Sequence, residues 1–345
     1  MEGGGAYNAN SAIQASGAAF ALPMLEEAAR EVPISGNKRA IVIADYGSSE
    51  GRNSAAAIRA ALARLRERFG KGRPVIVVHS DLPANDFSTL FNVIEAEGGY
   101  AGDDDAVFPS AVGRSFYRSV LPESYVDLGW SSYAAQWLSR TPSLVAGHIL
   151  SDRGSATERR AFIDQARSDW EAFLTLRARE LRPGGRLAVA MPAPDAVGSL
   201  PSLPLFDAAV QAIADMEEDG LLSGSERAGM VLPFHHRTHE EMLAPFGRPG
   251  LRSRWRVLSC SITPIGDTAH DQFVRDGNPK ALAATRAGFF RATFGPILAS
   301  SLGSGRTDGE RREFLTQFER SLRERIEGVQ RPIAYAVSRL ALERL

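Results

Sequence analysis

A carboxylate and two glycines directly follow an apolar run in this sequence. Residues 40–44 are apolar without period-two alternation, as in a strand buried on both faces of a parallel sheet. Asp45, Gly47 and Gly51 come next, and helical spacing begins near Ile58. A strand, a tight turn and a helix place N–H groups and a carboxylate where open α/β sheets bind ligands. The pattern predicts a site for a nucleotide-like cofactor, although an ordinary strand-to-helix turn would look similar.

The glycine spacing narrows the choice of cofactor. Ser49 stands where the dinucleotide motif Gly-x-Gly-x-x-Gly has its second glycine, which normally lets the backbone approach a pyrophosphate. The remaining Asp-x-Gly-x-x-x-Gly suits a cofactor without phosphate, such as S-adenosylmethionine. A second apolar run, residues 75–78, ends near Asp81, which could accept hydrogen bonds from ribose hydroxyls. A turn or cap role is the alternative for Asp81, because Pro83 and Asn85 follow it.

The predicted elements surround this site. Residues 1–32, with a helical segment interrupted near Pro23, are predicted to form an amino-terminal lid. Residues 33–194 and 305–345 are predicted to form an α/β core, a Rossmann-like and mostly parallel sheet with helices on both faces. Residues 195–304 have helical patterns and are predicted to form a cap over an acceptor pocket. The expected core strands are residues 40–44, 75–78, 126–128, 187–191 and 333–342.

Composition restricts the class of protein. The chain has 345 residues, a formal net charge of −1 and 44% hydrophobic residues, as in ordinary globular proteins. Its charge offers no electrostatic footprint for nucleic acid or an anionic membrane. The single cysteine, Cys260, cannot form an intrachain disulfide, and no apolar run approaches membrane-spanning length. We therefore expect a soluble cytoplasmic protein with a small-molecule substrate.

Five separated motifs resemble the SABATH family of S-adenosylmethionine-dependent methyltransferases, named for salicylate, benzoate and theobromine members. Residues 3–14 are similar to the family's glycine-rich opening with Ser-Tyr-x-x-Asn-Ser-x-x-Gln, and residues 45–53 to Asp-Leu-Gly-Cys-Ser-Ser-Gly-Pro-Asn. Residues 80–87 are similar to Asn-Asp-Leu-Pro-Gly-Asn-Asp-Phe, residues 112–117 to Gly-Ser-Phe-Tyr, and residues 131–139 to Ser-Ser-Tyr-Ser-Leu-x-Trp-Leu-Ser. The motifs follow the family's order, and the resemblance is weaker in the carboxyl-terminal half.

The resemblance implies a class I methyltransferase fold, S-adenosylmethionine as cofactor, and roles for individual residues. The implied cofactor-binding residues are Ser11, Asp45, Gly47, Asn53, Asp81, Leu82, Ser115 and Phe116. The implied acceptor-pocket residues are Tyr7, Gln14, Tyr133, Gln136 and Trp137. Asp81 would bind the ribose, and Ser115 and Phe116 would lie near the adenine. Gln14 and Trp137 would donate hydrogen bonds to an acceptor carboxylate.

Departures from the family pattern leave the identity of the methyl acceptor undetermined. The sequence departs from the family pattern at Tyr46, Glu50, Arg52 and Trp130, and at Gln136, where the family often has Met or His. Structural explanations also exist for the implied site residues. Asn53 could cap the following helix, and Trp137 could be a core residue. Gln14 could lie on a helix surface, and Tyr7 and Tyr133 could be packing aromatics.

Rival chemistries fit the sequence less well. His235 and His239 are four residues apart, but the capping box Thr238-x-x-Glu241 would start a helix between them and separate their faces. We therefore expect no metal site, and we assign Phe234 and His235 to the cap's wall over the acceptor. Three aspartates at residues 103–105 are expected in a solvated loop. No nucleophile elbow of a serine hydrolase and no Gly-x-x-x-x-Gly-Lys phosphate loop is present.

The expected reaction forms the methyl ester of a small aromatic or lipophilic carboxylic acid. Such an acid, with a pKa of about 4, is ionised at neutral pH, so the transfer needs no general base and no catalytic residue is expected. N-methylation of a xanthine-like heterocycle is the alternative. A more distant alternative is that the same core serves a nicotinamide oxidoreductase or a non-catalytic binding protein. Family analogy suggests a homodimer, while nothing in the sequence supports a role for Mg²⁺.

Overall fold

Seven strands form one sheet in the order β3-β2-β1-β4-β5-β7-β6 within the part of the chain that the structure describes. Strands β1 to β5 run parallel, and β7 pairs antiparallel with both β5 and β6. The strands are β1 (Ile41–Tyr46), β2 (Val75–Asp81), β3 (Val107–Gly113), β4 (Val126–Ser132), β5 (Leu181–Pro192), β6 (Trp255–Ile265) and β7 (Tyr335–Arg344).

The structure is a computed structural model that describes residues 4–34, 39–102, 104–195 and 198–345. Gly3 and Asp103, which belong to segments discussed above, lie outside these ranges. The longer helices are α2 (Ala12–Glu31), α3 (Arg52–Phe69), α4 (Phe87–Glu95), α5 (Ala156–Glu180), α6 (Leu203–Glu218), α10 (Thr268–Asp276), α11 (Pro279–Ser300) and α12 (Asp308–Ile326). The shorter helices are α1 (Ala6–Asn10), α7 (Gly224–Gly229), α8 (His239–Leu243) and α9 (Pro249–Arg252). No helix of the described residues is long and apolar enough to cross a membrane.

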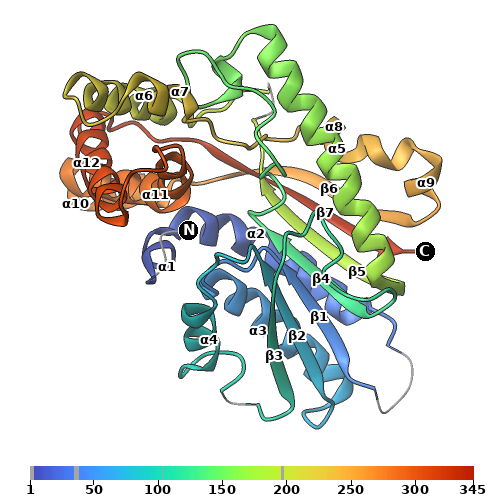
Figure 1. Ribbon diagram of the computed structural model, residues 1–345. Coiled ribbons are helices and arrows are strands. Elements are labelled where there is room, and N and C mark those ends of the chain that lie inside the picture. The colour runs from blue at the N-terminus through green and yellow to red at the C-terminus, as the bar shows by residue number, and fades with distance from the viewer. Residues whose placement is uncertain (1–3, 35–38, 103, 196–197) are drawn as a thin grey trace.

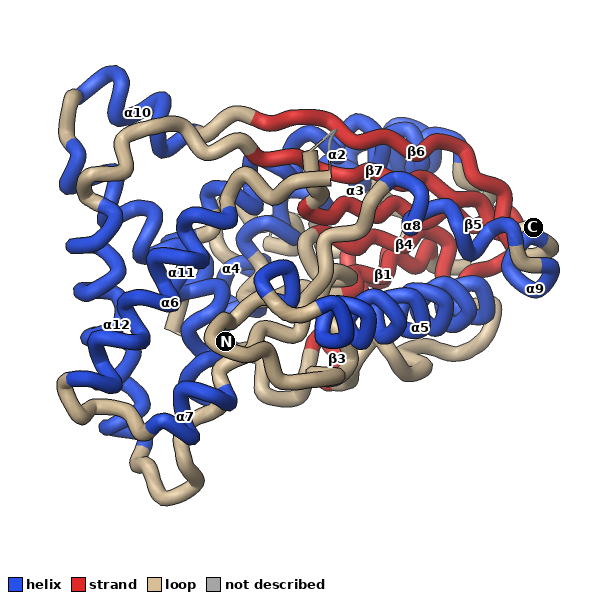
Figure 2. Tube along the Cα trace, turned by 90° about the horizontal axis from the view of Figure 1, so that it is seen from above, coloured by secondary structure: helices blue, strands red, loops and turns tan. Residues whose placement is uncertain are grey.

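Helices cover both faces of the sheet (Figure 1). On one face, Leu25 of α2 and Ile58 of α3 are buried against Ile43 of β1. On the other face, Trp170 and Phe173 of α5 pack against the sheet. Viewed from above, the strands lie between α5 and the pair α2 and α3 (Figure 2). This arrangement confirms the predicted α/β fold with a mostly parallel sheet.

A helical cap with its own apolar core stands beside the sheet (Figure 1). Helices α6, α11 and α12 share a cluster that includes Phe206, Phe290 and Phe318. The ring centroids of Phe206 and Phe290 are 5.2 Å apart, and those of Phe290 and Phe318 are 5.7 Å apart. Because this core is separate from the clusters under the sheet, the cap can present one face to the ends of the strands.

The structure corrects two of the predicted boundaries. Strand β6 lies inside the interval 195–304 assigned to the cap, yet it forms an edge of the sheet. Only its first and last residues, Trp255 and Ile265, are buried, so this exposed edge strand has no continuous apolar run to reveal it. Helix α12 lies inside the interval 305–345 assigned to the core, yet it packs against α6 and α11. Its apolar face, correctly predicted, does not specify which layer it joins.

The amino-terminal segment predicted as a lid, residues 1–32, belongs largely to the layer of helices on the sheet. Helix α2 continues through Pro23 and packs against α3, β5 and β7 as part of the layer on the sheet. Ala21 and Leu25, on either side of the proline, are fully buried. Their burial holds the helix together where proline removes one backbone hydrogen bond. Helix α1, which contacts α11, bridges the core and the cap, and Gln14 near the start of α2 adds a hydrogen bond to Thr293 of α11.

We predict that Asp267→Asn destabilises the protein by about 3–5 kcal/mol, because it leaves a buried guanidinium without its counter-charge. Asp267 Oδ2 accepts hydrogen bonds from Arg286 Nη2 at 2.7 Å and from Ile333 N at 3.0 Å, and the two charged side chains are 2% and 1% exposed. Denaturant unfolding measures the change. The control is Asp271→Asn, at an exposed position of α10, the helix that Asp267 caps, and equal losses in both variants would contradict the prediction.

Candidate active site

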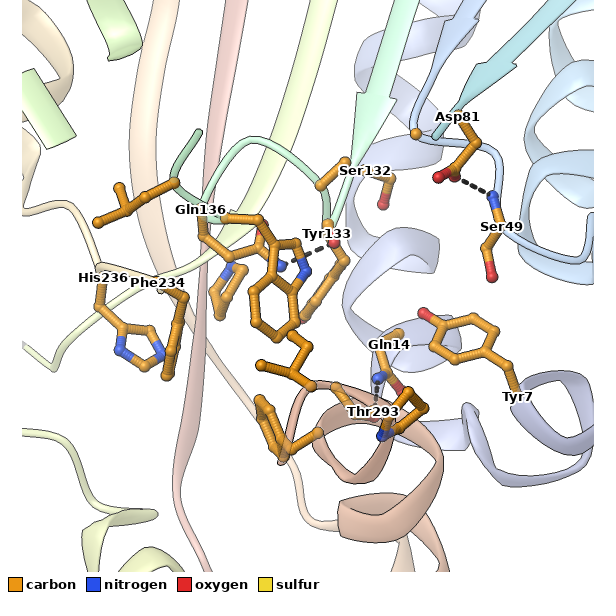
Figure 3. Close-up of a pocket in the computed structure, with 18 of the residues that line it drawn as sticks. Tyr7, Gln14, Ser49, Asp81, Ser132, Tyr133, Gln136, Phe234, His236 and Thr293 are labelled. Atoms are coloured by element: carbon orange, nitrogen blue, oxygen red, sulfur yellow. Dashed lines mark hydrogen bonds between the residues drawn. The ribbon is translucent and has the colours of Figure 1, made fainter. Parts of the chain in front are cut away.

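Two adjoining cavities lie where β1, β2 and β4 end. Figure 3 shows residues that line one of these pockets. The larger has a volume of about 360 Å³ and is lined by the strand ends, by α1 and α2, and by α6 and α11 of the cap. The smaller has a volume of about 20 Å³ and lies against the turn between β1 and α3. Both cavities are lined by Tyr7, Gln14, Gly47, Ser49, Ser132 and Tyr133.

The turn after β1 is shaped by left-handed backbone. The angle φ is 95° at Gly47, 54° at Ser49 and 94° at Gly51. A Cβ atom on Gly47 would lie 2.2 Å from the Cβ atom of Ala134, in the loop that follows β4. Glycine is therefore required at position 47 by both its conformation and its close neighbour.

The carboxylate of Asp81 is held at the cavity wall by two backbone donors. Ser49 N donates to Oδ2 and Leu82 N donates to Oδ1, each at 2.8 Å. Burial raises the pKa of Asp81 above its usual value; the two N–H groups lower it and the nearby Asp45 raises it. The two donors fix the orientation of a hydrogen-bond acceptor on the larger cavity, as binding of ribose hydroxyls would require.

The charges around the turn suit a cation. Asp45 and Glu50 are buried beside Asp81, so three carboxylates gather at the cofactor side of the site. Such a cluster disfavours phosphate and favours a ligand with positive charge. S-adenosylmethionine carries a sulfonium and an ammonium group and no phosphate. The residues present therefore fit this cofactor.

The structure brings together most of the predicted cofactor residues. The larger cavity is lined by Gly47, Asp81, Leu82, Ser115 and Phe116. The smaller cavity is lined by Gly47, Asp45 and Asn53. Ser11 lines neither cavity, because it lies buried between α1 and α2 with 3% of its surface exposed.

Helix α1 is tied directly to the cofactor turn. Asn8 N donates to Glu50 Oε2 at 3.0 Å, and Asn8 Nδ2 donates to the Glu50 carbonyl at 3.1 Å. In return, Arg52 N donates to Asn8 Oδ1 at 3.2 Å. These bonds place the neighbouring Tyr7 against both cavities. Glu50, a departure from the family pattern, thus joins the lid to the turn.

Aromatic rings form much of the remaining wall. The ring centroid of Trp137 lies 5.6 Å from that of Phe234 and 5.9 Å from that of Phe294. Tyr133 has a φ of 52° and packs against Gly17 of α2, where a Cβ atom would lie 1.8 Å from the tyrosine oxygen. The predicted acceptor residues that line the larger cavity are Tyr7, Gln14, Tyr133, Gln136, Trp137 and Phe234.

The polar groups on this wall are neutral. Gln14 Nε2 donates to Thr293 Oγ1 at 3.0 Å, and Gln14 Oε1 has no partner among the described residues. Gln136 Nε2 donates to the Tyr133 carbonyl at 2.7 Å, which fixes its amide because a carbonyl can only accept. The indole N–H of Trp137 has no hydrogen-bond partner within the described ranges. It is therefore available to a ligand.

His236, rather than the predicted His235, lines the larger cavity. His235 Nε2 instead lies 3.1 Å from the carboxylate of Glu241 in α8. Burial, with a contribution from His235, lowers the pKa of His236 to about 3, so this imidazole is neutral at physiological pH. The capping box at Thr238 starts α8 as predicted. In the described parts of the chain, no group of three His, Cys, Asp or Glu side chains could hold a metal ion.

Sequence reasoning predicted a cap over the acceptor pocket but missed the residues of α6 and α11 that line the cavity. The residues it did not identify include Phe206 of α6 and Phe289, Thr293, Phe294 and Ile297 of α11. The four residues in α11 have helical spacing and could have been recognised as one face. Spacing alone does not distinguish a face that lines a cavity from one that packs in a core.

Comparison with known proteins agrees with this geometry. Residues 1–341 match the family described as SAM dependent carboxyl methyltransferase. The chain belongs to this family. The resemblance predicted from the five motifs, and S-adenosylmethionine as the cofactor, are thereby confirmed.

Individual members of the family match over different lengths. Methyltransferase LUC1 of Fusarium sp is 32% identical over 70% of this chain, a match that spans only 65% of that protein. Gibberellic acid methyltransferase 2 of Arabidopsis thaliana is 26% identical over 88% of this chain and 84% of its own length. The solved structure of a loganic acid methyltransferase with SAH has a TM-score of 0.78 at 20% identity, covering 98% of this chain and 96% of that one. That structure shares the fold.

We predict that Gly47→Ala weakens binding of S-adenosylmethionine at least tenfold, because the new methyl group forces the turn and the Ala134 loop apart. Strain at this φ costs of the order of 1–3 kcal/mol in stability. Gly220→Ala is the matched control, since Gly220 has a φ of 74° with open space around it. Calorimetric titration measures binding, and similar affinities in the two variants would refute the requirement at Gly47.

We also predict that Gly17→Ala raises KM for the methyl acceptor several-fold with little change in cofactor affinity. Alanine normally stabilises a helix by about 0.5–1 kcal/mol over glycine, but here its methyl group must displace the ring of Tyr133 from the cavity wall. Gly309→Ala in α12, where the nearest atom would be 3.7 Å away, is the control. Unchanged acceptor kinetics in Gly17→Ala would show that Tyr133 does not shape the pocket.

Proposed function

We propose that this protein transfers the methyl group of S-adenosylmethionine to the carboxylate of a small aromatic or lipophilic acid and releases the methyl ester. One observation carries the proposal: the acceptor side of the site combines aromatic walls with neutral hydrogen-bond donors. Among the described residues that line the larger cavity, none is Lys or Arg. Membership of the family and the name of the gibberellic acid relative support an acid as the acceptor.

Neutral donors suit this reaction because they orient a carboxylate without forming a tight ion pair. An ion pair with Arg would engage both oxygens and reduce their nucleophilicity. The indole of Trp137 can donate one hydrogen bond and leave the other oxygen directed toward the cofactor. When bound, S-adenosylmethionine supplies an electrophilic methyl group on its sulfonium. Alignment of the two reactants can supply roughly 7–11 kcal/mol of the barrier. The site needs no general base, because the acceptor carboxylate is already ionised at neutral pH.

Gln14 can supply the second donor by turning its amide. The hydroxyl of Thr293 can either accept or donate a hydrogen bond. With the amide reversed, Oε1 accepts from Thr293 and Nε2 becomes available to the cavity. A bound carboxylate selects this orientation, because the present one would place a lone pair opposite the anion. Gln14 therefore serves as an adaptable partner, whereas the amide of Gln136 is fixed.

The enclosure of the site supports the same reaction. The larger cavity, of about 360 Å³, falls near the lower end of ligand pockets, which span roughly 300–1,000 Å³. Helix α1 closes it on the cofactor side and α11 on the cap side. Exclusion of water strengthens the attraction between a carboxylate and the sulfonium. A compact, mainly apolar acid is the acceptor that such a space favours.

Incubation with labelled S-adenosylmethionine and a panel of acids and xanthines tests the proposal. The panel contains salicylate, benzoate, indole acetate, cinnamates and medium-chain fatty acids. We expect a base-labile methyl ester from one class of acid. A base-stable product on a xanthine would replace the proposal with N-methylation. No transfer and no cofactor binding would refute the enzymatic assignment for this chain.

The variant Trp137→Phe tests whether the indole N–H donates a hydrogen bond to the acid. It keeps an aromatic ring against Phe234 and Phe294. We predict that KM for the acid rises about 10- to 100-fold, as expected for losing one hydrogen bond to a charged group, while affinity for S-adenosylmethionine stays within twofold. Steady-state kinetics and calorimetry measure the two effects. Equal loss of acid and cofactor binding would instead indicate a general role of Trp137 in packing.

A further inference from the structure

A buried chain of three polar side chains lies behind the cofactor turn. Asp45 Oδ2 is 2.8 Å from His79 Nδ1, and His79 Nε2 is 2.6 Å from the hydroxyl of Tyr100. Asp45 is the next-to-last residue of β1, His79 is its register partner on β2, and Tyr100 follows α4. The three residues are 1%, 0% and 5% exposed. Polar groups this deeply buried stabilise a fold only when all of them are satisfied.

The direction of each hydrogen bond follows from the chemistry of the groups. An ionised Asp45 can only accept, so His79 Nδ1 carries the proton and donates it. In a neutral imidazole Nε2 then accepts, so the Tyr100 hydroxyl donates to it. Burial, together with the charge of Asp45, raises the pKa of Tyr100 far above its usual value and keeps this hydroxyl protonated. Tyr100 thus donates to His79, and His79 donates to the Asp45 carboxylate.

The hydrogen bonds from Tyr100 to His79 and from His79 to Asp45 hold the Asp45 carboxylate in place. Within the described ranges, His79 is the only hydrogen-bond partner of the Asp45 side chain. Asp45 also lines the smaller cavity, which shares six lining residues with the larger one. The same cavity is lined by Arg52 and Asn53 at the start of α3, where helix N–H groups favour an anion. An acid on one side and a helix N-terminus on the other complement an amino-acid zwitterion.

We propose that His79 and Tyr100 are positioning residues that aim the Asp45 carboxylate at the ammonium group on the amino-acid end of S-adenosylmethionine. Asp81, held separately by Ser49 and Leu82 on the larger cavity, is left for the ribose. The two carboxylates therefore divide the cofactor between them, and only one of them depends on His79. This inference rests on the cofactor assignment and not on the identity of the acceptor.

Two variants of similar size isolate the hydrogen bond to Asp45. His79→Asn can keep a donor near the position of Nδ1, whereas His79→Leu removes it. Calorimetric titration would use S-adenosylmethionine, S-adenosylhomocysteine and 5′-methylthioadenosine, the last of which lacks the amino-acid end. In His79→Leu we expect about tenfold weaker binding of the first two ligands and an unchanged affinity for 5′-methylthioadenosine. His79→Asn should remain within about threefold of the parent protein for all three ligands.

The ligand comparison separates positioning from folding. If His79 only stabilised the fold, His79→Leu would weaken the binding of all three ligands in parallel, and that result would overturn the proposal. Unchanged binding in His79→Leu would also overturn it. Tyr100→Phe, which removes only the outer hydrogen bond, should show the same selectivity as His79→Leu with a smaller magnitude. If the parent protein bound none of the three ligands, the cofactor assignment itself would fail, which is a different outcome from loss of selectivity in the variants.

Discussion

The close approach of Gly47 to Ala134 is the constraint on which the rest of the site depends. It brings the turn after β1 against the loop after β4, so one contact joins the cofactor side to the acceptor side. The loop that contains Ala134 continues to Gln136 and Trp137, while the turn carries Ser49, whose backbone N–H holds Asp81. The two reactants must meet within bonding distance, and this contact sets how near their binding groups can lie.

Charge is distributed unequally across that contact. Carboxylates gather on the cofactor side, whereas the acceptor side has aromatic rings and neutral donors. A cationic cofactor is therefore bound by opposite charge, and an anionic acceptor is attracted mainly by the cofactor itself once water is excluded. This division explains why the reaction needs few dedicated groups.

The groups that line the site are held in place by residues behind them. His79 and Tyr100 support Asp45, backbone N–H groups support Asp81, and Asn8 links α1 to Glu50. Each support comes from a different segment of the chain. A side chain that is fixed by such partners loses little further entropy when a ligand binds, which is the physical benefit of preorganisation.

The sequence by itself determined the parallel core and the turn after β1, because buried strands, glycine turns and capping boxes are encoded over short distances. Most of the site residues that it predicted line one of the two cavities. It did not reveal β6, an edge strand with little burial, or that α12 joins the cap, because partners distant in the chain decide both. Only the tertiary structure placed α11, and His236 rather than His235, at the larger cavity. The physical reason is that an amphipathic face or a pair of adjacent histidines specifies a side chain's chemistry, whereas its direction depends on long-range packing.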